Sequence, residues 1–66
     1  MMGAQQAEAP TMQPIIVKRY AQSRLYDTAA LRYVTIANLR DWRRRGVAFR
    51  VVEAETGKDI TAVLLA

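Results

Sequence analysis

The sequence predicts a small α+β domain in which a small antiparallel sheet of short strands packs against one amphipathic helix. Short runs of β-branched and aromatic residues suit strands, and residues 36–45 have the period of an amphipathic helix. Turn-forming residues separate these segments. A chain of 66 residues holds one domain at most, and a domain of about 60 residues buries only about 60% of the surface that its unfolded chain exposes. We therefore expect a thin core.

The chain is expected to consist of a tail and one domain. Residues 1–14 contain Gln, Ala and two prolines without periodicity, which predicts a disordered N-terminal tail. The domain is expected at residues 15–66. It should begin with a strand at 15–20, where β-branched and aromatic residues dominate. Residues 21–31 lack a clear period and predict a loop or a short second strand.

Two further extended segments are expected, at residues 32–35 and 49–54. Since Thr35 immediately precedes the periodic segment, its hydroxyl is expected to cap a helix that spans residues 36–45. Gly46 then supplies the residue that ends this helix in a left-handed conformation.

A second helix is expected at the C-terminus, with Asp59 as its N-cap. Ile60, Val63 and Leu64 have the spacing of one helical face, but the chain ends at Ala66 after less than two turns. We expect this short or truncated helix either to dock on a neighbouring element or to continue in a longer protein.

Composition excludes several classes of function. The chain has neither cysteine nor histidine, so it lacks the residues of disulfide frameworks, zinc fingers and imidazole-based triads. Its carboxylates form no pair with a proton-transfer partner, and its three glycines are too far apart for a phosphate-binding loop. The sequence therefore predicts no enzyme, no metal and no cofactor. It also contains neither a membrane-spanning run nor a signal peptide, which predicts a cytoplasmic protein.

The net charge of +4 predicts an anionic partner. All ten Lys and Arg residues lie between Lys18 and Lys58, and several alternate with tyrosine. Arginine can bind phosphate or a guanine edge and a tyrosine hydroxyl can donate to phosphate, so this pattern is typical of a nucleic-acid surface. The alternative is that the tyrosines are half-buried sheet residues and the cations a solvated rim. The contact set that we predict is Lys18, Arg19, Tyr20, Arg24 and Tyr26.

The helix contributes a secondary set. Arg40 and Arg44 are like charges four residues apart, which destabilises an isolated helix, so a bound anion would explain them. Arg43 is expected to lay its methylenes along the core edge. The alternative is that cations in the last turn serve only the helix dipole.

Several motifs resemble the N-terminal DNA-binding domain of the polyhydroxyalkanoate (polyhydroxybutyrate) synthesis repressor or accumulation regulator family. They are the strings at residues 16–21, 24–28, 33–35, 49–54 and 56–61. The resemblance implies a bacterial repressor of storage-polyester genes that leaves DNA when it binds the polymer. The chain departs from the family pattern in two places. Gln22 and Ser23 stand where the family usually has an Asn-Arg pair, and the helix is more basic than is usual in the family.

The resemblance and the charge pattern together predict sequence-specific binding of double-stranded DNA by a cytoplasmic, nucleoid-associated regulator. Because the expected core is thin and repressors commonly bind DNA as two-fold dimers, we expect a homodimer or higher oligomer. Polymer or granule binding is expected only in a full-length form. Two alternatives remain open: a protein or granule-surface adaptor that docks its basic face on an acidic partner, and an RNA-binding protein that stacks single strands on Tyr20 and Tyr26.

Overall fold

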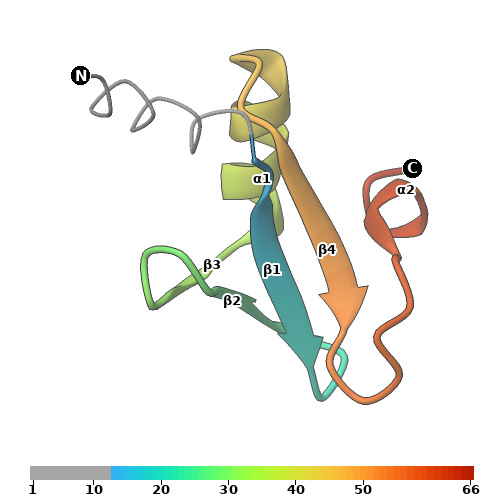
Figure 1. Cartoon of the computed structure of the whole chain (residues 1–66). Helices are drawn as coiled ribbons and strands as arrows, with labels where there is room; N and C mark the ends of the chain where they lie inside the picture. The colour runs from blue at the N-terminus through green and yellow to red at the C-terminus, as the bar shows by residue number, and fades with distance from the viewer. Residues whose placement is uncertain (1–12) are drawn as a thin grey trace.

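The computed structural model describes residues 13–66, so the predicted tail lies outside the described residues except for its last two positions. Four strands and two helices follow along the chain (Figure 1). They are β1 (Ile15–Tyr20), β2 (Arg24–Asp27), β3 (Arg32–Val34), α1 (Ile36–Arg44), β4 (Phe49–Glu53) and α2 (Thr61–Leu64). One sheet, one main helix and one short helix confirm the predicted α+β class. The segment at 21–31 contains the short second strand.

The sheet has the order β3-β2-β1-β4 and is mixed, whereas the sequence predicts an antiparallel sheet. β1 pairs antiparallel with β2, and β2 with β3, but β4 lies parallel to β1. The reason is the connection through α1. Because α1 carries the chain back along the sheet after β3, β4 starts at the same end as β1 (Figure 1). The antiparallel prediction is therefore wrong for this one pair of strands.

Local chemistry sets the limits of α1. Thr35 caps the helix as predicted: the amide of Asn38 donates to its Oγ1 over 3.1 Å, and the Thr35 amide donates to Asn38 Oδ1 over 2.9 Å. This reciprocal pair is a capping box. Gly46 follows with φ +80°, which confirms the predicted left-handed residue. The helix ends at Arg44, one residue before the predicted end.

The second helix begins later than predicted. Its N-cap is Ile60, which makes no side-chain cap hydrogen bond, so the prediction of Asp59 at that position is wrong by one residue. Asp59 still serves the turn that precedes α2. Its Oδ1 accepts from the Thr61 amide over 2.9 Å and from the Thr61 hydroxyl over 2.7 Å. Both bonds are local, as in other Asx turns.

The core lies on one face of the sheet. Strand residues at alternating positions bury their side chains there, together with one residue of α1 and one that follows α2. The fully or nearly fully buried hydrophobic residues are Val17, Leu25, Val34, Leu39, Val51 and Leu65. Trp42 of α1 and Phe49 of β4 add an edge-to-face contact, with ring centroids 5.6 Å apart.

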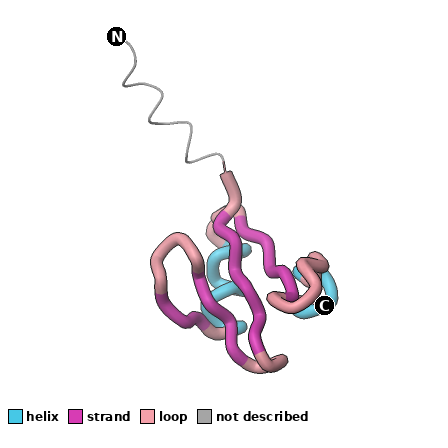
Figure 2. The backbone as a smooth tube through the Cα atoms, turned by 60° about the horizontal axis from the view of Figure 1, so that its bottom comes forward, coloured by secondary structure: helices cyan, strands magenta, loops and turns pink. Residues whose placement is uncertain are grey.

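The other face of the sheet carries no helix. Both backbone views place α1 behind the same side of the strands, and α2 lies beside β4 (Figures 1 and 2). The side chains of the uncovered face are therefore available to a partner.

Among the described residues, no helix is long and apolar enough to cross a membrane.

Candidate nucleic-acid interface

The sheet face that α1 leaves uncovered is called the open face below. Its side chains belong to the strand positions that alternate with the core residues, and the pairing registers align them across the four strands. They are Ile16, Lys18, Tyr20, Arg24, Tyr26, Tyr33, Arg50 and Val52. This set contains three tyrosines and three cations, and none of these strand positions holds a carboxylate.

Four of the predicted contact residues meet at the centre of this face. Lys18 lies directly opposite Tyr26, and Tyr20 lies directly opposite Arg24, on the antiparallel strands β1 and β2. Directly opposed residues have Cβ atoms about 4.5–5.5 Å apart, so each cation adjoins a phenol ring both along the strand and across it. Lys18 and Arg24 are exposed, Tyr20 is 43% exposed and Tyr26 is half-buried.

A tight turn holds the two strands in this register. The Ser23 amide donates to the Tyr20 carbonyl over 3.1 Å, which closes the turn between β1 and β2. Ala21 and Gln22 occupy its two central positions with φ of 50° and 64°. Positive φ at both central residues matches the twist of a β-hairpin, although Gly or Asn adopts it at lower cost.

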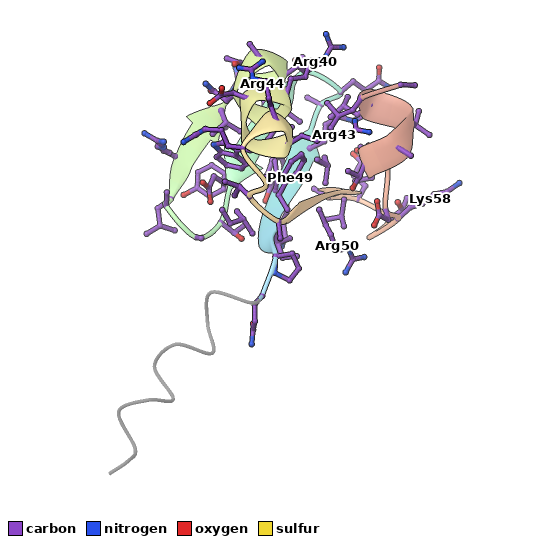
Figure 3. All side chains as sticks on the ribbon, turned by 90° about the horizontal axis from the view of Figure 1, so that it is seen from above. Arg40, Arg43, Arg44, Phe49, Arg50 and Lys58 are labelled. Carbon is purple, nitrogen blue, oxygen red and sulfur yellow. The ribbon has the colours of Figure 1, made fainter. Side chains whose placement is uncertain are left out.

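Two open-face residues were missed by the predicted contact set. Tyr33 of β3 is 61% exposed, and its ring meets the ring of Tyr26 edge to face at a centroid distance of 5.2 Å. Arg50 of β4 points to the side away from α1 (Figure 3). The alternation of arginine and tyrosine indicates Tyr33 as a contact residue, because Tyr33 follows Arg32 directly. Sequence gave no comparable signal for Arg50, since the orientation of β4 depends on its partner strand.

Arg19 does not lie with the other predicted contacts. It faces the covered side, where its Nη2 and Nε reach Oε1 of Glu53 at 2.8 and 3.0 Å. The two residues are direct partners in the parallel register of β1 and β4. Their side chains are only 26% and 18% exposed, so this ion pair closes the edge of the core.

The helix arginines also lie on the covered side of the sheet. Figure 3 shows Arg40 and Arg44 on α1 and Arg50 on the opposite side of the sheet. Arg44 pairs with Asp41 at 2.6 Å, and Arg45 pairs with the same carboxylate at 2.9 Å. Asp41 and Arg45 are four residues apart on the helix, and Asp41 offsets the repulsion among the helix cations.

Three of the described carboxylates, Asp27, Asp41 and Glu53, are engaged away from the open-face cations Lys18 and Arg24. Asp27 is buried and accepts from the amides of Ala29 and Ala30 at 2.8 and 2.9 Å. Glu53 and Asp41 bind the cations named above. Lys18 and Arg24, by contrast, make no ion pair within residues 13–66. A phosphate backbone would find both cations available.

Asp59 lies beside this face and pairs with one of its cations. Its Oδ2 accepts from Arg50 Nε over 3.0 Å. Hydrogen bonds from the Thr61 amide and hydroxyl, followed by that from Arg50, lower the pKa of Asp59 to about 2. The carboxylate is therefore ionised at neutral pH and holds Arg50 by one edge of its guanidinium.

Sites of other kinds are poorly supported. Within the described part of the chain, no group of three or more His, Cys, Asp or Glu residues could hold a metal ion. A hollow of about 480 Å³ on the covered side lies between α1, β4 and the C-terminal segment, with Arg43, Phe49 and Leu65 in its lining. Asp59 and Thr61 also line it, and their hydroxyl-carboxylate hydrogen bond of 2.7 Å belongs to the turn before α2.

Comparisons with known proteins agree with the nucleic-acid interpretation. Residues 16–66 match the family model of the PHB/PHA accumulation regulator DNA-binding domain. An uncharacterized protein of Allochromatium vinosum is 44% identical over 50 residues, which cover 76% of this chain and 33% of the relative. A Thiocystis violacea protein, described as an uncharacterized protein in the phbA 5′ region, is 40% identical over 50 residues that cover 76% of this chain and 36% of that protein.

The chain thus spans about a third of the length of these curated relatives. No solved structure matches it. The family model, however, covers all six helices and strands except the first residue of β1. The resemblance predicted from the sequence motifs is therefore confirmed, and the chain belongs to the family of PHB/PHA accumulation regulator DNA-binding domains.

Proposed function

We propose that this domain binds double-stranded DNA through the open face and serves a repressor of genes for polyhydroxyalkanoate storage. The observation that carries the proposal is the central block of Lys18, Tyr20, Arg24 and Tyr26, in which cations and phenols alternate across two paired strands. A two-stranded ribbon fits the major groove of B-DNA, so this block matches the shape as well as the charge of a duplex.

Each central side chain has a role that its chemistry suits. Arg24 can bind the O6 and N7 atoms of guanine through two parallel hydrogen bonds, which makes it the strongest candidate for base recognition. Lys18 can neutralise a phosphate or donate to a base edge. The hydroxyls of Tyr20 and Tyr26 can donate to the DNA backbone.

The proposal does not include every residue predicted from the sequence. Arg19 lies in its ion pair with Glu53, and Arg40 and Arg44 lie on the other side of the sheet. A single straight duplex on the open face cannot also reach α1, because a sheet and the layer packed on it are separated by about 10 Å. We therefore assign DNA contact to the open face alone.

The proposal also includes oligomeric state, location and polymer binding. Repressors commonly bind paired half-sites as two-fold dimers, and we propose the same for this one. Its place of action would be the bacterial cytoplasm, at the nucleoid where its DNA lies. Since the matched residues cover only 33% and 36% of the two relatives, binding of polymer or granules is assigned to segments outside the matched region.

Fluorescence anisotropy tests the central proposal. Duplexes are first selected from a random library and then compared with scrambled duplexes and with single strands over a salt series. We expect a preference of about 10³-fold or more for the selected duplex at physiological salt. Equal binding to all duplexes, or a preference for single strands, would contradict it.

Arg24→Ala provides the residue-level test, with Lys58→Ala as the charge-matched control. Both residues are exposed and lack an ion pair among the described residues, but Lys58 lies in the turn after β4. Arg24→Ala is expected to lower affinity for the selected duplex by about 10-fold or more without unfolding the domain. If both variants weaken binding equally, the surface is merely basic and Arg24 reads no base.

A further inference from the structure

We propose that the four strands of the open face have separate roles on DNA: β1 and β2 enter the major groove and contact bases, while Tyr33 of β3 and Arg50 of β4 contact phosphates on the two opposite walls of the groove. This inference rests on the proposed function. It adds two binding residues and predicts which substitutions change sequence preference and which change only affinity.

The widths of the sheet and of the groove are the basis of this division. Neighbouring strands lie about 4.8 Å apart, so the two central strands span about 5 Å and the outermost two about 14 Å between backbones. The major groove of B-DNA is about 12 Å wide. Two strands with their side chains fit between the groove walls, but four do not. Side chains on β3 and β4 therefore meet the phosphate backbones that border the groove.

Arg50 is well prepared for such a contact. Its Nε donates to Asp59 Oδ2 at 3.0 Å, while the side chain remains 51% exposed. Asp59 is fixed in turn by its two hydrogen bonds from Thr61. Neither Nη atom of Arg50 has a hydrogen-bond partner among residues 13–66. Asp59 thus orients the guanidinium through one edge and leaves its terminal nitrogens for a phosphate, which arginine binds with parallel hydrogen bonds.

Tyr33 occupies the corresponding place at the other border. It lies opposite Tyr26 in the register of β2 and β3, and the edge-to-face contact with Tyr26 restricts its ring. With 61% of the residue exposed, it is the most exposed tyrosine of the open face. Its hydroxyl makes no hydrogen bond within the described residues, so it can donate to a phosphate oxygen.

The test measures the affinity of the 66-residue chain for the selected duplex, for each single-base variant of that duplex, and over a salt series. Arg50→Ala is expected to weaken binding about 10-fold to every duplex alike and to reduce the salt slope by about 1. Tyr33→Phe is expected to weaken binding about 5-fold to every duplex alike, without change in the salt slope. Arg24→Ala, by contrast, should lose discrimination at one base pair.

Two further variants complete the design. Arg50→Lys keeps the charge, so the parental salt slope is expected. Lys58→Ala removes one charge outside the open face and is expected to leave affinity within about 2-fold of the parent. Circular dichroism of each variant shows that the fold is retained, which is expected because the substituted side chains are exposed.

The outcomes separate this inference from the function on which it rests. If the parent prefers the selected duplex but Arg50→Ala behaves like Lys58→Ala, the wall contact is wrong while the proposed function stands. A change of base preference at a single position by Arg50→Ala or Tyr33→Phe would also overturn the division of roles. If the parent shows no duplex preference, both proposals fail.

Discussion

Arg19 and Arg24 provide the sharpest test of how the sheet divides neighbouring cations between its two faces. Arg19 lies with Glu53 at the edge of the core, with Nη2 to Oε1 and Nε to Oε1 distances of 2.8 and 3.0 Å. Arg19→Ala removes both hydrogen bonds and leaves a carboxylate that is only 18% exposed without its cation. We therefore expect Arg19→Ala to affect folding, and Arg24→Ala to affect DNA binding.

The magnitude follows from burial. A carboxylate that loses its partner in a fully buried pair costs about 3–5 kcal/mol, and a typical lost hydrogen bond costs about 1 kcal/mol. Since solvent still reaches Arg19 and Glu53, we expect Arg19→Ala to lower the free energy of unfolding by about 1–2 kcal/mol. For a domain of this size, that change corresponds to a decrease of about 5–15 °C in Tm. A domain with about 3–8 kcal/mol of stability still folds at 10 °C after this loss.

Urea denaturation followed by circular dichroism measures this change. The double variant Arg19→Ala with Glu53→Ala is the control, because removing both charges should recover part of the lost stability. Anisotropy at 10 °C then compares the folded Arg19→Ala and Arg24→Ala variants on the selected duplex. If Arg19→Ala is as stable as the parent but loses sequence discrimination, the assignment of Arg19 to a structural role is refuted.

Three further predictions concern stability. Ala21→Gly is expected to stabilise the domain by about 0.5–1 kcal/mol in urea denaturation, because φ at this residue is 50° and glycine adopts that conformation without strain; a loss of stability would count against the strained turn. Leu39→Ala removes a fully buried side chain and is expected to cost about 2–5 kcal/mol, which leaves much of the protein unfolded at 37 °C by circular dichroism; a Tm equal to that of the parent would show that α1 does not close the core. The pKa of Asp59 is lowered from 3.8 to about 2 in the fold, so its stabilising contribution is present above about pH 5 and is lost as the pH falls from about 5 to about 2. Unfolding free energies at pH 5, 3 and 2 should therefore decrease more steeply for the parent than for Asp59→Asn, and parallel curves would contradict this role.

The sequence was most informative where local chemistry decides the structure. Thr35 and Gly46 mark the limits of α1 because an N-cap hydroxyl and a left-handed C-terminal residue act within one helical turn. The apolar spacing within residues 36–45 likewise predicts which side of α1 packs on the sheet. The pair of Asp41 and Arg45 could also be predicted, since residues four apart on a helix are neighbours.

Properties that depend on distant strands could not be obtained in the same way. The parallel register of β1 and β4 joins residues that lie 34 positions apart, such as Arg19 and Glu53, and no local pattern encodes it. The same register decides which side of β1 is covered. Adjacent residues of a strand point to opposite faces. The sequence therefore does not distinguish whether Lys18 or Arg19 lies on the uncovered face until the partner strands are known.

The composition of the open face strengthens the case that a partner covers it. The solvated face of a sheet that is covered on one side ordinarily carries polar side chains. This face instead presents Tyr20, Tyr26 and Tyr33 among cations that have no carboxylate in the strand positions beside them. The exposed rings of Tyr20 and Tyr33 and the unpaired cations Lys18 and Arg24 contribute little to the stability of a thin core, because the fold itself does not bury them. On a duplex, the cations displace condensed counterions and the rings lose water against sugar and phosphate. The face that adds least to folding is therefore the face that has most to gain from binding DNA.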